Sequence, residues 1–293
     1  SFALKRAVDP GFDPANRVTA EVQLPPARYP RGAPRSQFFS ELAAELRALP
    51  GVSGVSAVSH LPIRHPRNTF LVRETSTPES GRSVFLRSVL PEYFQTMTIP
   101  LVAGRAFSPA DGPEGPPVAI LNRTMAEAFF PDQNPIGSQV ELDYFGTPRP
   151  LEVVGVVEDV RISGLAFDPE SALYLPHAQF AARTMQLVVR VDGNPRPVME
   201  GMRAALRRMD PGLPLAGLTT LEEVVEGSVA EDGLVAAFLT FYALLPLLLA
   251  AVGLYAVMAS YVAQRLHEIG IRITLGADPS RIGAMVVGRG VWL

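Results

Sequence analysis

The stretch RVTAEVQLPPARYPRGAPRSQFFSELAAELRALPGVSGVSAVS, residues 17–59, has the pattern of a strand, a helix and a second strand. Apolar and polar residues alternate over 17–24, as they do in a strand with one buried face. Apolar residues then recur at helical spacing over about 35–49, and the following Pro50 ends that helix. Residues 51–59 are rich in valine and serine and predict the second strand.

A second stretch repeats this order later in the chain. Residues 185–191 have the composition of a strand. Asn194 before Pro195 predicts a helix start, because asparagine caps helices and proline fits their first turn. Apolar residues recur at helical spacing over about 195–209, and 213–218 are extended again. The two stretches predict one α+β subdomain that is built from two strand–helix–strand (βαβ) halves.

The segment between the two halves is rich in strand-like runs. Apolar runs predict strands at 84–90, 116–121 and 151–160, and a short helix is expected over 122–130. We therefore expect an inserted subdomain of mixed α/β type over 81–182. This insertion divides the first subdomain into 15–80 and 183–220.

A long uncharged segment follows the second half. From Gly233 to Gln264 no residue is charged, over 32 positions, whereas ~20 apolar residues in a helix are enough to cross a bilayer. The alternative is a buried core helix, but core helices rarely exceed ~20 residues and keep a polar stripe. Thr220 and Glu223 have the spacing of a capping box. We expect residues 221–264 to form a stalk and transmembrane helix.

The charges on the two sides of this segment predict its orientation. Residues 222–232 include five acidic side chains and no basic one, whereas Arg265, Arg272, Arg281 and Arg289 follow the segment. Because basic residues stay on the cytoplasmic side, residues 1–232 are expected in the periplasm and 265–284 in the cytoplasm, with the protein in the inner membrane. Residues 1–14 are expected to follow a preceding span, and 285–293 to begin the next one.

The composition gives no support for catalysis or for nucleic-acid binding. The net charge is −3 and there is no cysteine. The single lysine, Lys5, is not part of a phosphate-binding loop, so the chain is not expected to bind ATP. His60 and His65 lie in a proline-interrupted loop without a neighbouring carboxylate, and we expect surface histidines there instead of metal ligands. We expect no enzymatic activity, catalytic residue, metal or cofactor.

Three parts of the sequence resemble one family of membrane proteins. They are VDPGFDPANRVTAEVQLPPARYP (8–30), PVAILNRTMAEAFFPDQNPIGSQV (117–140) with VVGVVEDVRISGL (153–165), and AAVGLYAVMASYVAQRLHEIGIRITLGADPSRI (250–282). The last part contains the pattern R-x-x-E-I-G-I-R-x-x-L-G-A, from Arg265 to Ala277. In these parts the chain resembles the FtsX-like permeases of ABC transporters, of the MacB type, and among them the acidobacterial permeases.

The resemblance implies a porter-like external subdomain that is split by a strand-rich insertion. It also implies a short cytoplasmic coupling helix at 265–284 that contacts a separate ABC ATPase subunit. The matching residues of this helix are Arg265, Glu268, Gly270, Arg272, Leu275 and Gly276. Further partners implied by the resemblance are a second permease copy, in a homodimer or a paired permease, a periplasmic adaptor protein and membrane lipid. No nucleic-acid partner is expected.

Three functions remain open on the sequence alone. The first is a permease subunit that transmits cytoplasmic ATP hydrolysis to a periplasmic domain and so drives export of hydrophobic or amphipathic cargo. The second is a membrane regulator that activates a periplasmic cell-wall hydrolase, although the external region at 1–232 is much larger than in that class. The third is a membrane-anchored binding module without an ATPase. The resemblance favours the first function.

Overall fold

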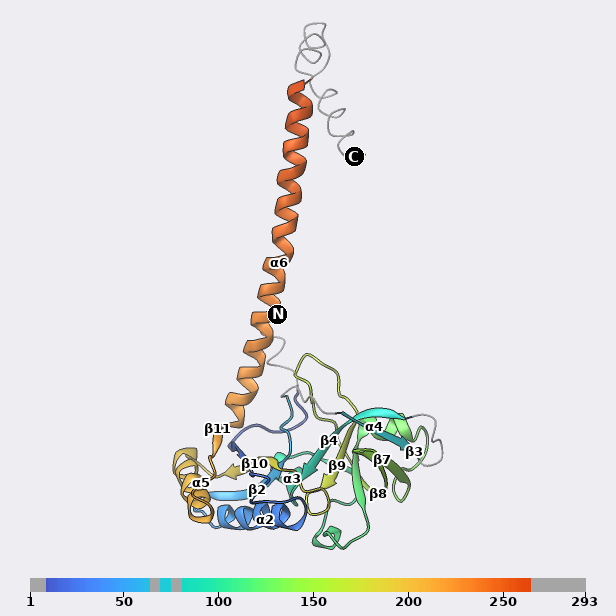
Figure 1. Ribbon diagram of the computed structural model, residues 1–293, viewed down its shortest axis with the longest axis vertical. Helices are drawn as coiled ribbons and strands as arrows, with labels where there is room; N and C mark the ends of the chain where they lie inside the picture. Colours follow the sequence, from blue (N-terminus) through green and yellow to red (C-terminus); the bar gives the residue numbers. More distant parts are fainter. Residues whose placement is uncertain (1–8, 64–68, 75–80, 265–293) are drawn as a thin grey trace. The chain divides into compact units, whose positions relative to one another are not determined.

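The computed structural model describes residues 9–63, 69–74 and 81–264, and all strands in this part of the chain belong to one continuous sheet (Figure 1). Contacts divide the chain into two units, the first ending at Ala230 and the second beginning at Glu231. In chain order the elements are β1 (Arg17–Gln23), α2 (Ala33–Arg47), β2 (Val52–Val58), β3 (Thr69–Glu74), β4 (Arg82–Val89), α3 (Tyr93–Met97), β5 (Leu101–Gly104), a 3-10 turn (Pro109–Asp111), β6 (Val118–Asn122), α4 (Arg123–Phe129), β7 (Gln139–Tyr144), β8 (Thr147–Val157), β9 (Ala172–Pro176), β10 (Thr184–Val191), α5 (Pro195–Met209), β11 (Ala216–Thr220) and α6 (Leu221–Gln264).

The two predicted βαβ halves form one four-stranded antiparallel sheet. Its order is β11-β1-β10-β2. β10 of the second half therefore lies between β1 and β2 of the first half, and β1 lies between β10 and β11 of the second half. This is the ferredoxin-like, or split βαβ, arrangement. The register places Ala20 beside Leu187 and Leu187 beside Ala57. The prediction of two strand–helix–strand halves in one α+β subdomain is confirmed, although the last strand begins at Ala216 and not at residue 213. The interleaving of their strands is seen only in the structure.

Helices α2 and α5 pack on the same face of this sheet. Figure 1 shows α2 running beside β2, and α2 contacts α5 as well as the strand. Asn194 caps α5 as expected, because its side chain accepts a hydrogen bond from the Arg196 amide at 3.0 Å. The shared core contains Val18, Ala20, Val22, Phe39, Leu42, Leu46, Val55, Ala57, Leu187, Val189, Val198, Met202 and Leu206. Burial of these side chains is the main stabilising term for this layer.

The inserted strands close into a six-stranded ring. Pairing runs β4-β3-β7-β8-β6-β9 and returns from β9 to β4, while β5 pairs with β8 outside the ring. Side chains from all six strands fill the ring, including Val72, Val84, Leu121, Leu142, Val153 and Leu173. The strands expected at 84–90, 116–121 and 151–160, and the helix at 122–130, are all present as β4, β6, β8 and α4. β3, which precedes residue 81, also pairs within the ring.

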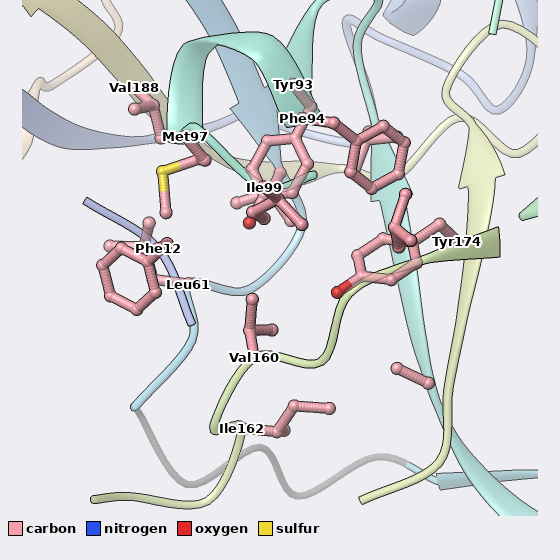
Figure 2. Close-up of a cluster of buried hydrophobic side chains, with 14 of the residues drawn as sticks. Phe12, Leu61, Tyr93, Phe94, Met97, Ile99, Val160, Ile162, Tyr174 and Val188 are labelled. Atoms are coloured by element: carbon pink, nitrogen blue, oxygen red, sulfur yellow. The ribbon is translucent and has the colours of Figure 1, made fainter. Parts of the chain in front are cut away.

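A third cluster of buried side chains joins the ring to the other face of the four-stranded sheet, and we call it the central cluster. Figure 2 shows Phe12, Leu61, Tyr93, Phe94, Met97, Ile99, Val160, Ile162, Tyr174 and Val188 gathered in it. The ladder between the four-stranded part and the ring pairs only Val58 with Val89, and the central cluster packs between these two parts. Leu221 and Val224 of α6 belong to the same cluster.

Helix α6 begins with the predicted capping box. The Glu223 amide donates to Thr220 Oγ1 at 3.2 Å, and the Thr220 amide donates to Glu223 Oε2 at 3.4 Å. The backbone is helical from Leu221 to Gln264, as expected. Among the described residues, no helix is both long enough and apolar enough to cross a bilayer, and the span predicted for 233–264 is not confirmed. The predictions for the start of the chain, for 265–284 and for 285–293 fall on residues outside the described part.

Candidate functional site

A cleft of the first unit lies where the chain leaves the four-stranded sheet after β2 and returns to it before β10. Its volume is about 820 Å³. Its lining residues come from both the sheet and the ring, and they are Glu21, Arg31, Arg35, Ser59, His60, Leu61, Tyr144, Phe145, Ala181, Ala182, Arg183, Thr184 and Gln186. A volume of this size lies within the range of small-molecule sites in proteins.

Three arginines line one part of this cleft. Arg31 lies in the loop before α2, Arg35 in the first turn of α2, and Arg183 directly before β10. Arg35 is fixed by hydrogen bonds from its Nε to the Tyr29 carbonyl at 3.0 Å and from Nη1 to the Ala181 carbonyl at 3.5 Å. No ion pair links any of the three to a carboxylate within the described residues.

The three positive charges repel one another. Burial, followed by the nearby charges of Arg31 and Arg183, lowers the pKa of Arg35. A guanidinium stays protonated under physiological conditions even so. The cleft therefore has a standing positive potential that a bound anion would relieve.

Two aromatic rings, those of Tyr144 and Phe145, form a rim of the cleft beside Arg31. The guanidinium carbon of Arg31 lies 4.8 Å from the ring centre of Tyr144 and 5.3 Å from that of Phe145, within the range of cation–π attraction. Phe145 and Gly146 form the two-residue turn between β7 and β8, with φ of 53° and 80°. Positive φ at both positions defines a type I′ turn, for which Asn-Gly is the preferred sequence. Phe145 is nevertheless 72% exposed at this turn.

The remaining polar lining is neutral or internally paired. Glu21 accepts a hydrogen bond from the Gln186 amide group. His60 Nδ1 lies 3.2 Å from the Ser59 hydroxyl. Burial, followed by the charge of Arg87, lowers the pKa of His60 to about 4, so this ring is neutral at pH 7. The expectation of a surface histidine is wrong for His60, because the turn after β2 brings it to the half-buried wall of the cleft. No metal-binding group of histidine and acidic residues occurs within the described part.

A second functional feature is the attachment of α6 to the first unit. The Asn16 amide donates to Glu222 Oε1 at 3.1 Å, which ties the chain before β1 to the first turn of α6. The neighbouring Arg17 is 2% exposed, and its Nε donates to the Thr96 carbonyl at 2.7 Å. The first of these contacts and the burial of Leu221 in the central cluster attach the start of α6 to the first unit, and the Arg17 bond joins β1 to α3 beside it. We call this attachment the seat of α6.

Comparison with known proteins identifies the chain's family. Residues 3–205 match the family of MacB-like periplasmic core domains. The chain belongs to this family. The crystal structure of the periplasmic region of MacB from Actinobacillus actinomycetemcomitans shares the fold of this core domain, with a TM-score of 0.50 at 16% identity, over 74% of this chain and 94% of that one.

Relatives of this MacB-like core domain include export permeases. The probable syringafactin export ATP-binding/permease protein SyfD of Pseudomonas syringae pv. tomato is 28% identical over 71% of this chain and 33% of its own length. The macrolide export ATP-binding/permease protein MacB of Aggregatibacter actinomycetemcomitans is 23% identical over 68% of this chain and 31% of its own length. The uncharacterized ABC transporter permease YknZ of Bacillus subtilis is 24% identical over 87% of this chain and 62% of its own length. The chain thus spans about a third of the first two relatives.

The coupling residues predicted from the sequence are not described by the structure. Arg265, Glu268, Gly270, Arg272, Leu275 and Gly276 all lie beyond Gln264, the last described residue. The cleft was missed by sequence reasoning, because its lining comes from segments that are far apart in the chain. Two local signals could have pointed to it: the spacing of Arg31 and Arg35, and a phenylalanine before glycine in a short hairpin turn.

Proposed function

We propose that this MacB-like core domain is the external part of an ABC exporter permease that converts cytoplasmic ATP hydrolysis into motion of a periplasmic domain and drives export of hydrophobic or amphipathic cargo. The observation that supports this function best is the seat of α6. Leu221 is 1% exposed and Val224 is 8% exposed in the cluster that joins the four-stranded sheet to the ring. A displacement of the start of α6 must therefore disturb the junction between these two parts.

The capping box strengthens this mechanical connection. It satisfies the Thr220 and Glu223 amides, which would otherwise be unpaired at the helix start. β11 ends at Thr220 and α6 begins at Leu221 without a linker between them. A strand that continues directly into a capped helix transmits force with little slack, whereas a flexible linker would absorb it.

The remaining parts of the proposal concern the whole protein. We propose an inner-membrane location, with residues 1–232 in the periplasm and 265–284 in the cytoplasm, and α6 continuing through the bilayer. ATP hydrolysis is assigned to a separate ABC ATPase subunit, and no catalytic residue to this chain. A second permease copy and a periplasmic adaptor are proposed as further partners. The proposed contact with the ATPase is formed by residues 265–284, where Arg265, Glu268, Gly270, Arg272, Leu275 and Gly276 match the family pattern.

Charge reversal in the full-length permease tests this proposal. Arg272→Glu places like charges at the contact, which costs several kcal/mol in interfaces, and we expect loss of ATPase co-purification and of transport-linked ATP hydrolysis at normal membrane expression. Arg207→Glu is the matched control, because Arg207 is exposed on α5 in the external domain. If Arg272→Glu keeps both the co-purified ATPase and coupled hydrolysis, the proposed contact is wrong.

A further inference from the structure

The cleft between the four-stranded sheet and the ring has an excess of positive charge. Its lining includes three arginines and one acidic residue, Glu21, and the only histidine in it, His60, is neutral at pH 7. The Glu21 carboxylate accepts a hydrogen bond from the Gln186 side chain. Among the described residues it forms no ion pair with the three arginines. Guanidinium groups bind carboxylates with two parallel charge-assisted hydrogen bonds, so a cluster of this kind suits an acidic ligand.

The rim of the same cleft holds an aromatic ring at a conformational cost. Phe145 takes a left-handed conformation at φ 53°, where a bulky side chain is disfavoured, and it is 72% exposed. Its ring contacts Tyr144 at 4.9 Å and Phe70 at 5.8 Å between centres, so the aromatic group is held in place at the rim. Asparagine would satisfy the turn better, and burial does not explain the phenylalanine. Strained residues of this kind are typical of ligand-binding sites.

The three arginines and the two aromatic residues line one cleft of about 820 Å³, and the Arg31 guanidinium lies against both aromatic rings. We propose that this cleft binds an amphipathic carboxylate, with the acidic group on Arg31, Arg35 and Arg183 and the apolar chain along Tyr144 and Phe145. The carboxylate of the ligand contacts the arginines beside the four-stranded sheet. Its apolar chain contacts the aromatic residues of the six-stranded ring of strands. This inference rests on the proposed function in one respect: in an exporter, such a ligand is cargo.

Calorimetry on the whole chain tests the binding chemistry. The chain is placed in phosphatidylcholine nanodiscs and titrated with N-dodecanoylglycine, with N-dodecanoylglycinamide as the uncharged probe of the same length. We expect saturable binding of the acid and at least tenfold weaker binding of the amide. Arg35→Gln and Arg183→Gln each weaken binding of the acid at least tenfold, because each removes a charged donor. Arg207→Gln, on the exposed surface of α5, leaves the affinity unchanged.

A second variant separates binding from folding. Phe145→Asn installs the preferred Asn-Gly turn, so we expect an unchanged or raised Tm together with about tenfold weaker binding of N-dodecanoylglycine. Binding of N-acetylglycine, which has the carboxylate without the long chain, is expected to be weak and unaffected by Phe145→Asn. An unchanged affinity for the dodecanoyl probe in Phe145→Asn overturns the apolar part of the proposal.

The other outcomes are equally decisive. Equal affinities for the acid and the amide, or wild-type affinity in both arginine variants, overturn the anion site. Nanodiscs that contain phosphatidylglycerol distinguish a soluble amphiphile from bilayer lipid: retained affinity supports the proposal, and displacement of the probe by the lipid overturns it. Absence of probe binding together with intact ATP-coupled export removes this inference alone. If the protein binds the probe but its Arg272→Glu variant shows normal coupling to ATP hydrolysis, the proposed binding site in the cleft stands and the proposed ATPase contact is wrong.

Discussion

The seat of α6 gives a quantitative prediction for Leu221→Ala. Leu221 is 1% exposed in the central cluster, so the substitution removes three buried carbon atoms. At about 0.8 kcal/mol per carbon the transfer cost is about 2.4 kcal/mol, and an unfilled cavity would add to it. Val224 and Val225 lie beside Leu221 in this cluster and can partly fill the space. We therefore expect the transfer and cavity costs together to destabilise this contact by about 2.5–3 kcal/mol.

This cost should appear first as easier opening of the start of α6. Amides from residue 225 onward have acceptors within the helix, and hydrogen exchange reports their opening free energy. A loss of about 2.5–3 kcal/mol corresponds to roughly 70- to 160-fold faster exchange at residues 225–228. Leu46→Ala is the matched control, because Leu46 is 0% exposed in the core under α2, on the other face of the sheet. It should lower global stability by a similar amount and leave native-state exchange at 225–228 unchanged. Less than a twofold change at 225–228 in Leu221→Ala, with the expected response of Leu46→Ala, would refute the anchoring argument.

Two further predictions concern packing and pH. Gly104 and Gly146 have φ of 74° and 80°, but a Cβ at Gly104 would lie 2.3 Å from the Val154 carbonyl oxygen, whereas Gly146 has nothing within 4 Å. Gly104→Ala should therefore destabilise the fold by at least about 2 kcal/mol more than Gly146→Ala in urea unfolding, and equal losses would contradict the close approach. Burial lowers the pKa of His177 from 6.5 to about 4. Between pH 6.5 and pH 4 the His177 ring is protonated in the unfolded chain and neutral in the folded chain. The free energy of unfolding therefore falls as the pH drops from 6.5 to 4, by up to about 3 kcal/mol. His177→Gln should flatten this part of the stability profile, and an unchanged slope would show that His177 does not titrate as stated.

The four-stranded sheet could be predicted because its signals are local. Alternation over 17–24, helical spacing after residue 35 and the Asn194-Pro195 start each depend on neighbouring residues. The repetition of the same order in two places then indicated two halves of one subdomain, whereas the interleaving of their strands depends on long-range pairing. Capping at Thr220 and Glu223 was predictable for the same reason, since the box needs only two side chains three residues apart.

The ring and the cleft could not be predicted, because both depend on contacts between distant segments. β9 pairs in parallel with β4, which is more than 80 residues earlier, and this pairing closes the ring. β3 shows no strict alternation of apolar and polar residues. β7 does alternate over Gln139–Tyr144, so a strand could have been predicted there, but its partners could not. The arginines of the cleft come from two segments that the sheet brings together. Arg31 and Arg35 lie before and within α2, and Arg183 lies before β10. Their grouping follows from the antiparallel pairing of β1 with β10.

The cleft and the central cluster, in which Leu221 is buried, share one residue, Leu61. It lines the cleft and belongs to the central cluster that contains Leu221. Packed side chains shift together, so a ligand that moves the wall at Leu61 changes the free energy of seating α6 if the two arrangements differ in ligand affinity. Linkage makes that effect reciprocal: the factor by which ligand changes the opening of residues 225–228 must equal the factor by which opening α6 changes ligand affinity. The coupling free energy can therefore be measured in two ways. One is hydrogen exchange at residues 225–228 with and without the dodecanoyl probe, and the other is the affinity of Leu221→Ala for that probe. Agreement between them would establish communication that spatial proximity alone does not establish.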